Sequence, residues 1–220
     1  MFRYVLFDLD GTLTDPKTGI TSCVQYALAD AGIEEPDLDK LEPFIGPPLT
    51  DSFREFYGFD DEQIKRAIDK YHERFDEKGI FENEIIEGIP ELLKALKDAG
   101  RRVSIASSKP RPLVIRILEH FEIAQYFDTV VGSEFDGRFA TKEAVVEEAL
   151  KQLVPSVYEK EDVAMVGDRK FDIQGARAHG LTGIGVSFGY AGEHELEDAG
   201  ADYIVDTVEE LQRLLLQGSL

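Results

Sequence analysis

From residue 88 onward, short apolar runs alternate with stretches that have helical periodicity. Ile89, Leu92, Leu93 and Leu96 follow the i, i+3, i+4, i+7 spacing of one helix face, and this pattern stops before Gly100. Similar patterns predict further helices at 112–120, 141–153, 172–179 and 208–216. Apolar runs between them predict strands at 102–107, 129–132, 163–167, 183–187 and 203–205.

The chain also opens on an apolar run, VLFDLDGTL at 5–13, in which Asp8 and Asp10 interrupt the hydrophobic residues. We interpret Val5, Leu6, Phe7 and Leu9 as a first buried strand, which ends at the two acids and the Gly11-Thr12 turn. Strands that alternate with helices favour a mostly parallel sheet covered on both faces. The predicted fold class is therefore α/β, with a Rossmann-like, doubly wound core.

Residues 15–86 break this alternation. Helical stretches at 19–30, 49–56 and 60–78 are visible there, and no stretch gives a convincing strand. The last of them has one apolar stripe, formed by Ile64, Ala67, Ile68, Tyr71 and Phe75. We therefore expect an all-helical domain at 15–86, inserted into an α/β core made of 1–14 and 87–220.

Charge and composition narrow the function. The 220-residue chain carries a net charge of −20, which disfavours nucleic acid and anionic membranes as partners. No apolar run approaches the roughly 20 residues that span a bilayer. Cys23 is the only cysteine, so no disulfide can form within the chain. We expect a cytoplasmic protein.

Acidic residues follow several of the predicted strands. Asp8 and Asp10 end the first strand, Asp168 ends the strand at 163–167, and Asp172 lies one turn further on. The carboxyl ends of parallel strands share one edge of the sheet, where ligands bind. Convergent carboxylates repel one another, so either their pKa values rise or a hard cation holds them together. Oxygen ligands beside a substrate phosphate favour Mg²⁺.

Other polar groups suit a phosphate. Lys142 begins a predicted helix, where a cation opposes the helix dipole and indicates a nearby anion. Ser107 ends the strand at 102–107 and Ser108 follows it, and their hydroxyls could bind phosphate oxygens. Carboxylates, Mg²⁺, lysine and hydroxyl together suggest phosphoryl transfer, with one aspartate as nucleophile and the other as general acid and base.

The motifs resemble a known family. DLDGT at 8–12, Ser107, Lys142 and VGDRKFD at 166–172 are similar, in this order, to the four motifs of the haloacid dehalogenase superfamily. The DxDGT form implies phosphatase chemistry, and the insert resembles the superfamily's small helical cap. The stretches GTLTDPKTGI and GDRKFDIQGARAHG look most like phosphoglycolate phosphatases and related 5′-nucleotidase-like enzymes.

The resemblance implies a role for each catalytic residue. Asp8 becomes the nucleophile, which forms an aspartyl-phosphate, and Asp10 becomes the general acid and base. Ser107 would bind the transferring phosphoryl group, and Lys142 would neutralise that group and Asp8. Lys109 is expected only to flank the site.

The resemblance also implies the magnesium ligands. Asp8 and Asp168 would bind Mg²⁺ through their carboxylates and Asp10 through its backbone carbonyl. Asp172 would support the site directly, or through water and Lys142. A helix-start role for Asp172 and a surface role for Lys142 stay open as alternatives.

These residues predict hydrolysis of a small phosphomonoester, such as phosphoglycolate or a nucleoside monophosphate. A β-phosphoglucomutase-like sugar-phosphate mutase is the first alternative, and a non-enzymatic receiver-type phospho-acceptor is a remote one. Specificity is expected from the insert, with the loop at 44–49 as a candidate to face the site. The acidic stretch at 193–202 is interpreted as a solvated surface.

Overall fold

A computed structural model describes residues 2–134, 136–154 and 158–218. Its larger sheet has the strand order β5-β4-β1-β6-β7-β8, and each of these neighbouring strands is paired in parallel. The strands are β1 (Tyr4–Phe7), β4 (Arg102–Pro110), β5 (Thr129–Ser133), β6 (Val163–Gly167), β7 (Thr182–Val186) and β8 (Tyr203–Val205). The predicted α/β class is confirmed.

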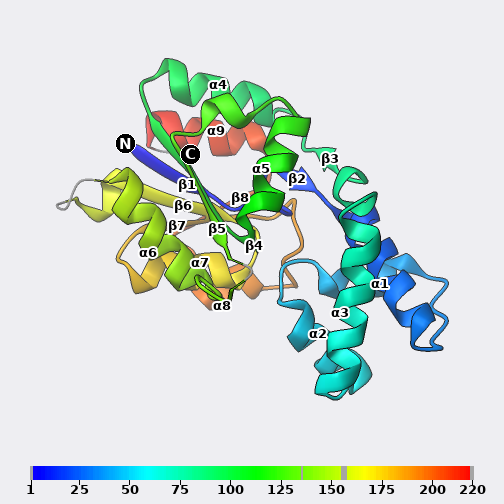
Figure 1. Cartoon of the computed structure of the whole chain (residues 1–220). Helices are drawn as coiled ribbons and strands as arrows, with labels where there is room; N and C mark the ends of the chain where they lie inside the picture. The colour runs from blue at the N-terminus through cyan, green and yellow to red at the C-terminus, as the bar shows by residue number, and fades with distance from the viewer. Residues whose placement is uncertain (1, 135, 155–157, 219–220) are drawn as a thin grey trace. The chain divides into compact units, whose positions relative to one another are not determined.

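Helices cover both faces of this sheet. In Figure 1, α4 and α9 lie on one side, and α6 and α7 lie on the other. The helices that belong with this sheet are α4 (Ile89–Asp98), α5 (Arg111–His120), α6 (Lys142–Leu153), α7 (Lys170–Ala178), α8 (Glu195–Ala199) and α9 (Val208–Gln217). Its 3-10 helices are η3 (Ala124–Tyr126) and η4 (Lys160–Asp162).

The central strands contain few polar residues because they form the middle of the apolar core. Every residue of β6 and β7 is buried, as expected for strands that have helices on both faces. On the α6 and α7 side, Leu6 and Met165 pack with Val146 and Ala176 in one buried cluster. This packing fixes β1 and β6 side by side, so residues that follow these two strands emerge at the same sheet edge.

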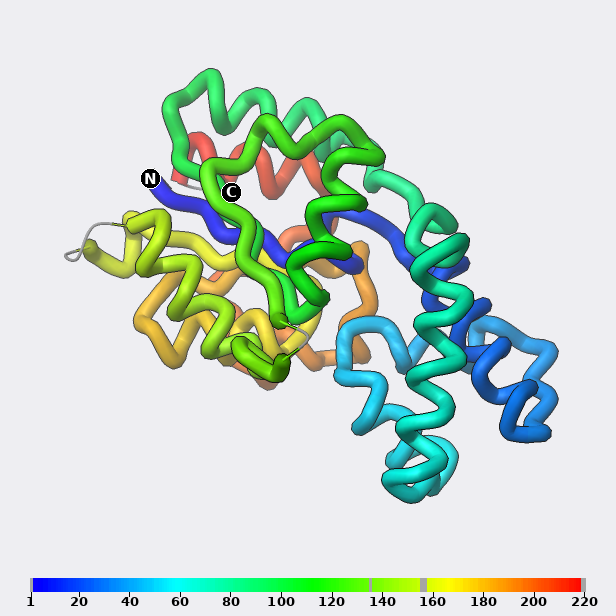
Figure 2. Tube along the Cα trace, viewed as in Figure 1, coloured from blue at the N-terminus to red at the C-terminus, as the bar shows by residue number. Residues whose placement is uncertain are grey.

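The chain forms two compact units, Met1–Thr14 with Ile85–Leu220, and Asp15–Glu84. Figure 2 follows the chain out of β1, through the second unit and back into α4. The chain passes from one unit to the other within two short strands, β2 (Thr14–Asp15) and β3 (Glu84–Ile85). These strands form a two-stranded sheet. Neither strand was predicted, since two-residue strands are too short to show periodicity. The expected second boundary, 86/87, therefore lies two residues beyond the observed one.

The second unit contains α1 (Lys17–Asp30), η1 (Leu38–Phe44), α2 (Leu49–Tyr57), α3 (Asp61–Phe75) and η2 (Gly79–Phe81). Asp60 caps α3 by accepting hydrogen bonds from Glu62 N and Gln63 N. The helix ends at Phe75, three residues before the expected end. Gly19 allows α1 to approach η2 closely, because a Cβ atom there would lie 2.1 Å from Gly79 O.

Most element boundaries agree with the sequence-based ones to within three residues. One clear difference is α8, which forms inside the stretch interpreted as a solvated surface, with Leu196 buried. A further finding concerns membranes: among the described residues, no helix is long and apolar enough to cross a bilayer.

Candidate active site

Asp8 is the first residue beyond β1, and the backbone holds it tightly. Its N–H donates to Val166 O at 2.9 Å, which continues the pairing with β6. The chain then turns sharply: the N–H groups of Thr12, Leu13 and Thr14 all point to Leu9 O. Gly11 has a φ of +80° in this turn, a conformation that favours glycine. Asp8 thus lies at the carboxyl edge of the sheet with little freedom to move.

Asp168 is the first residue beyond β6, and groups from distant parts of the chain surround it. Its Oδ2 accepts a hydrogen bond from Tyr190 N at 2.8 Å, and its Oδ1 accepts one from Thr12 Oγ1 at 3.3 Å. Two glycines touch it closely: an added Cβ would lie 2.2 Å from Asp168 Oδ2 at Gly11 and 2.3 Å from Asp168 Cβ at Gly189. The carboxylate is held in one orientation.

Asp172 approaches from the first turn of α7. Its Oδ2 accepts a hydrogen bond from Arg169 N at 3.0 Å and so satisfies a free donor at the helix start. Gly167 leaves room for it, because a Cβ atom there would lie 2.1 Å from Asp172 Cγ. The helix-start role left open in the sequence is therefore real. It does not exclude the site role, since the other oxygen, Oδ1, faces Lys142.

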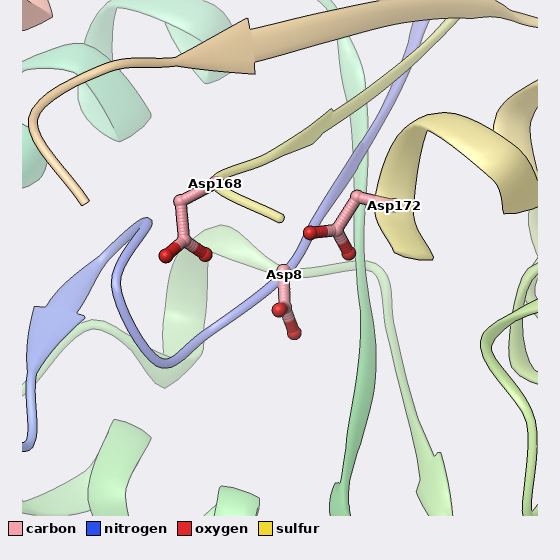
Figure 3. Close-up of side chains that lie close together, drawn as sticks. All are labelled: Asp8, Asp168 and Asp172. Atoms are coloured by element: carbon pink, nitrogen blue, oxygen red, sulfur yellow. The ribbon is translucent and has the colours of Figure 1, made fainter. Parts of the chain in front are cut away.

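The three carboxylates converge. Asp8, Asp168 and Asp172 each offer an oxygen such that these atoms all lie within 4.8 Å of one another, and Figure 3 shows the three side chains around a common space. Both Asp168 and Asp172 are fully or almost fully buried. Such a group of buried oxygens could hold a metal ion.

Lys142 is the first residue of α6, whose start is capped by Thr141 Oγ1. Its Nζ lies 2.8 Å from Asp8 Oδ1 and 2.8 Å from Asp172 Oδ1, and it donates to Ala106 O at 3.0 Å. Only 5% of its side chain is exposed, so a surface role is excluded. The two carboxylate contacts are ion pairs without hydrogen-bond geometry, because neither Oδ1 has a hydrogen-bond partner among the described residues.

Burial and charge perturb these groups strongly. Burial raises the pKa of Asp168 to about 8, with the neighbouring Asp172 and Asp8 adding to the effect. Burial also raises the pKa of Asp172 to about 6, opposed by Lys142 and reinforced by Asp8. Burial would lower the pKa of Lys142, but Asp172 and Asp8 outweigh it and raise that pKa. Lys142 alone would neutralise only part of the negative charge that the three carboxylates carry when ionised.

The remaining expected residues, Ser107 and Asp10, lie on the same edge. Ser107 is buried near the end of β4, directly after Ala106, whose carbonyl binds Lys142. Its Oγ accepts a hydrogen bond from Lys109 N at 3.3 Å. Asp10 is not part of the carboxylate cluster. Its Oδ2 instead lies 2.5 Å from Lys109 Nζ. Lys109 therefore does more than flank the site.

A family model described as "Haloacid dehalogenase-like hydrolase" matches residues 5–186. The chain belongs to this family. A protein named 5′-nucleotidase from Pseudomonas aeruginosa is 46% identical to the hydrolase over 193 residues, which are 87% of this chain and 86% of that protein. Tyrosine-protein kinase PtkA from Mycobacterium tuberculosis is 38% identical over 216 residues, 97% of this chain and 72% of that protein. The solved structure of a "predicted phosphatase" from Clostridium acetobutylicum has a TM-score of 0.91 and 46% identity, and the match covers 99% of both chains.

The sequence did not reveal several residues that shape the hydrolase's site. Tyr190 acts through its backbone N–H, which any residue type except proline would supply. Gly189 lies in GLTGIGVSFG, a stretch whose GxG does not fit a dinucleotide fingerprint. In the structure Gly183 and Gly185 belong to β7 and face buried side chains of α7 and α8. In the structure Gly189 directly follows a turn at 187–188.

Gly189→Ala tests how tightly Asp168 is enclosed. The new Cβ would lie 2.3 Å from Asp168 Cβ and 2.5 Å from Gly11 O, so backbone must shift. We expect the free energy of unfolding, measured by urea denaturation, to fall by about 1–3 kcal/mol. Gly192→Ala is a matched control in the same loop, because the nearest atom to its Cβ would be Glu195 Oε2 at 3.6 Å. Equal stability of the two variants would contradict this account.

Proposed function

We propose that the hydrolase is a Mg²⁺-dependent phosphatase that cleaves a small phosphomonoester through an aspartyl-phosphate on Asp8. The observation that carries this proposal is the position of Asp8, beyond β1, ion-paired to the buried Lys142 within a cluster of carboxylates. The relatives named 5′-nucleotidase and "predicted phosphatase" support the same chemistry.

The donor set fits magnesium. Asp8, Asp168 and Asp172 offer oxygen ligands only, which Mg²⁺ prefers, and the buried Oδ1 atoms of Asp8 and Asp172 have no hydrogen-bond partner among the described residues. The backbone carbonyl of Asp10 is a further proposed ligand. When bound, the ion would offset the repulsion between the carboxylates and neutralise charge on the phosphoryl oxygens.

The proposed reaction uses two aspartates in sequence. A carboxylate oxygen of Asp8 forms a bond to phosphorus while the bond from phosphorus to the leaving oxygen breaks. Asp10 gives its proton to that oxygen, which leaves as an alcohol. Asp10 then takes a proton from water, which attacks phosphorus and breaks the bond to Asp8. Inorganic phosphate leaves and both aspartates return to their starting forms.

Two other side chains stabilise charge in this scheme. Lys142 holds Asp8 through the 2.8 Å ion pair and would attract the negative phosphoryl group. Its link to Asp172 fixes the ammonium group between two elements of the core. The Ser107 hydroxyl would donate to a phosphoryl oxygen, since it lies near the end of β4, the strand paired with β1.

We propose a nucleoside 5′-monophosphate as the first substrate to test, because a relative at 46% identity is named 5′-nucleotidase. Phosphoglycolate remains an expected alternative. Residues 15–84 are proposed to act as a cap that selects the group attached to the phosphate. A cytoplasmic location, and the absence of nucleic acid or membrane partners, stay predictions from composition.

The likeness to PtkA favours a second candidate, transfer of a phosphoryl group from a nucleoside triphosphate to a tyrosine. The same Asp8 would have to pass phosphate to a phenol rather than to water. Incubation with γ-labelled ATP and a tyrosine peptide tests this candidate. Label transferred to tyrosine supports the kinase, whereas an unlabelled peptide together with phosphate release from a phosphomonoester supports the phosphatase.

Asp8→Asn tests the proposed nucleophile. With Mg²⁺, we expect the wild type to release inorganic phosphate from at least one member of a panel of nucleoside monophosphates, phosphoglycolate and sugar phosphates. The variant should lose activity by on the order of 10³-fold or more, because the amide is a poor nucleophile. Asp198→Asn, an exposed acid in α8, serves as control and should keep full activity. Activity that survives in Asp8→Asn would remove Asp8 from this role.

The raised pKa values predict a pH-dependent response to magnesium. The folded-state pKa of Asp168 is about 8, above its usual value of 3.8. Between these values the folded protein binds more protons than the unfolded chain, so metal-free stability falls as pH rises. Mg²⁺ favours the ionised carboxylates, and its stabilising effect should therefore grow with pH.

Thermal unfolding with and without Mg²⁺, at about pH 5.5 and about pH 8.5, measures this effect. The rise in Tm on adding Mg²⁺ should be larger at the higher pH, and Asp168→Asn should remove most of it. A rise in Tm that is equal at both pH values, or that is unchanged in the variant, would show that Mg²⁺ binds elsewhere.

A further inference from the structure

Lys109 and Asp10 form an ion pair, and Lys109 has no role in the proposed reaction described above. Lys109 Nζ lies 2.5 Å from Asp10 Oδ2, and only 8% and 14% of the two side chains are exposed. Exposed ion pairs contribute little to stability, whereas a nearly buried pair costs desolvation and must be well placed to persist. Each of the two lysines forms ion pairs with different acids. Lys142 pairs with Asp8 and Asp172, and Lys109 pairs with Asp10.

The backbone around Lys109 is fixed by several contacts. The β4–β5 register shifts between Ser107 and Pro110, and Ser133 Oγ donates to Ser108 O at 2.8 Å within this irregular stretch. Lys109 N donates to Ser107 Oγ. Gly132 packs closely beneath it, because an added Cβ there would lie 2.5 Å from Lys109 O. The lysine stem therefore starts from a well-defined point at the sheet edge.

The two oxygens of Asp10 differ in their surroundings. Oδ2 is held by Lys109, whereas Oδ1 is buried and has no hydrogen-bond partner among the described residues. A carboxyl group anchored through one oxygen presents the other in a fixed direction. Asp10 follows Asp8 by two residues, across the start of the Gly11 turn, so its side chain needs such an anchor to keep one orientation.

We infer that Lys109 is a positioning residue, which holds Asp10 so that Oδ1 exchanges the proton with the leaving oxygen and then with water. This inference rests on the proposed function. Lys109 itself neither gives nor takes a proton: the proton moves between Asp10 and the alcohol, and later between water and Asp10. Losing Lys109 should therefore slow only steps that need Asp10 in place.

The leaving group separates this role from a structural one. An alkyl phosphate, such as a nucleoside 5′-monophosphate, releases a strongly basic alkoxide that needs a proton. p-Nitrophenyl phosphate releases a weakly basic phenolate that does not. Hydrolysis of the aspartyl-phosphate also needs Asp10 and is the same for both substrates, so the comparison uses kcat/KM, which reports only the steps up to loss of the leaving group. For Lys109→Met we expect kcat/KM to fall about 10²-fold with the alkyl phosphate, which is the usual contribution of general acid catalysis. With p-nitrophenyl phosphate, kcat/KM should fall less than about threefold.

Further variants tie this effect to Asp10. Asp10→Asn should show the same dependence on the leaving group, and the double variant Asp10→Asn with Lys109→Met should be no slower than Asp10→Asn alone. Lys109→Arg keeps the charge and should recover part of kcat/KM with the alkyl phosphate. The double variant has no unpaired charge, so it also reports on Lys109 if Lys109→Met folds poorly. Lys97→Met removes another ion pair of this unit, with Asp128, and should change neither substrate's kcat/KM.

The outcomes are distinct. If Lys109→Met lowers kcat/KM equally for both substrates, or if the double variant has a much lower kcat/KM than Asp10→Asn, the positioning role is overturned while the phosphatase proposal stands. If the wild type hydrolyses neither substrate nor any other phosphomonoester, the proposed function fails and the inference fails with it. A loss confined to the alkyl phosphate supports both.

Discussion

Repulsion between buried carboxylates is the constraint on which the rest of this site depends. Asp8, Asp168 and Asp172 place oxygens within 4.8 Å of one another in a space that water barely reaches. One ammonium group, that of Lys142, lies against two of them. The repulsion that remains is unfavourable. The fold tolerates it because the packing of a large core holds in place the three backbone segments that carry these aspartates. A protein would retain such an arrangement only for a cation or for chemistry.

The sheet topology brings these groups together from distant parts of the sequence. β1 lies between β4 and β6, so the residues that follow three central strands meet at one edge. Glycines at 11, 167 and 189 then let backbone and carboxylates approach within distances that any side chain would prevent. Regular elements set the positions of the acids, and missing side chains set how closely they are enclosed.

The sequence was informative where a residue type itself carries the signal. Acids that follow apolar runs identified Asp8 and Asp168, and the parallel topology inferred from alternating strands and helices implied that they converge. The sequence carried no signal where the contact is made by a backbone atom or by a residue far away in the chain. The N–H of Tyr190 has no sequence signature, and the contact between Lys109 and Asp10 spans 99 residues of chain. The strands β2 and β3 were missed because two residues cannot show a period.

The pairing of β2 with β3 has a consequence for how this chain could diversify. The segment 15–84 leaves and re-enters the α/β unit at two points that are hydrogen-bonded neighbours. Insertions are best tolerated where their ends meet, since the host fold then closes without them. Selection could therefore lengthen, shorten or exchange this segment while the strand that carries Asp8 stays unchanged. New specificities would arise by replacing a module rather than by rebuilding a catalyst.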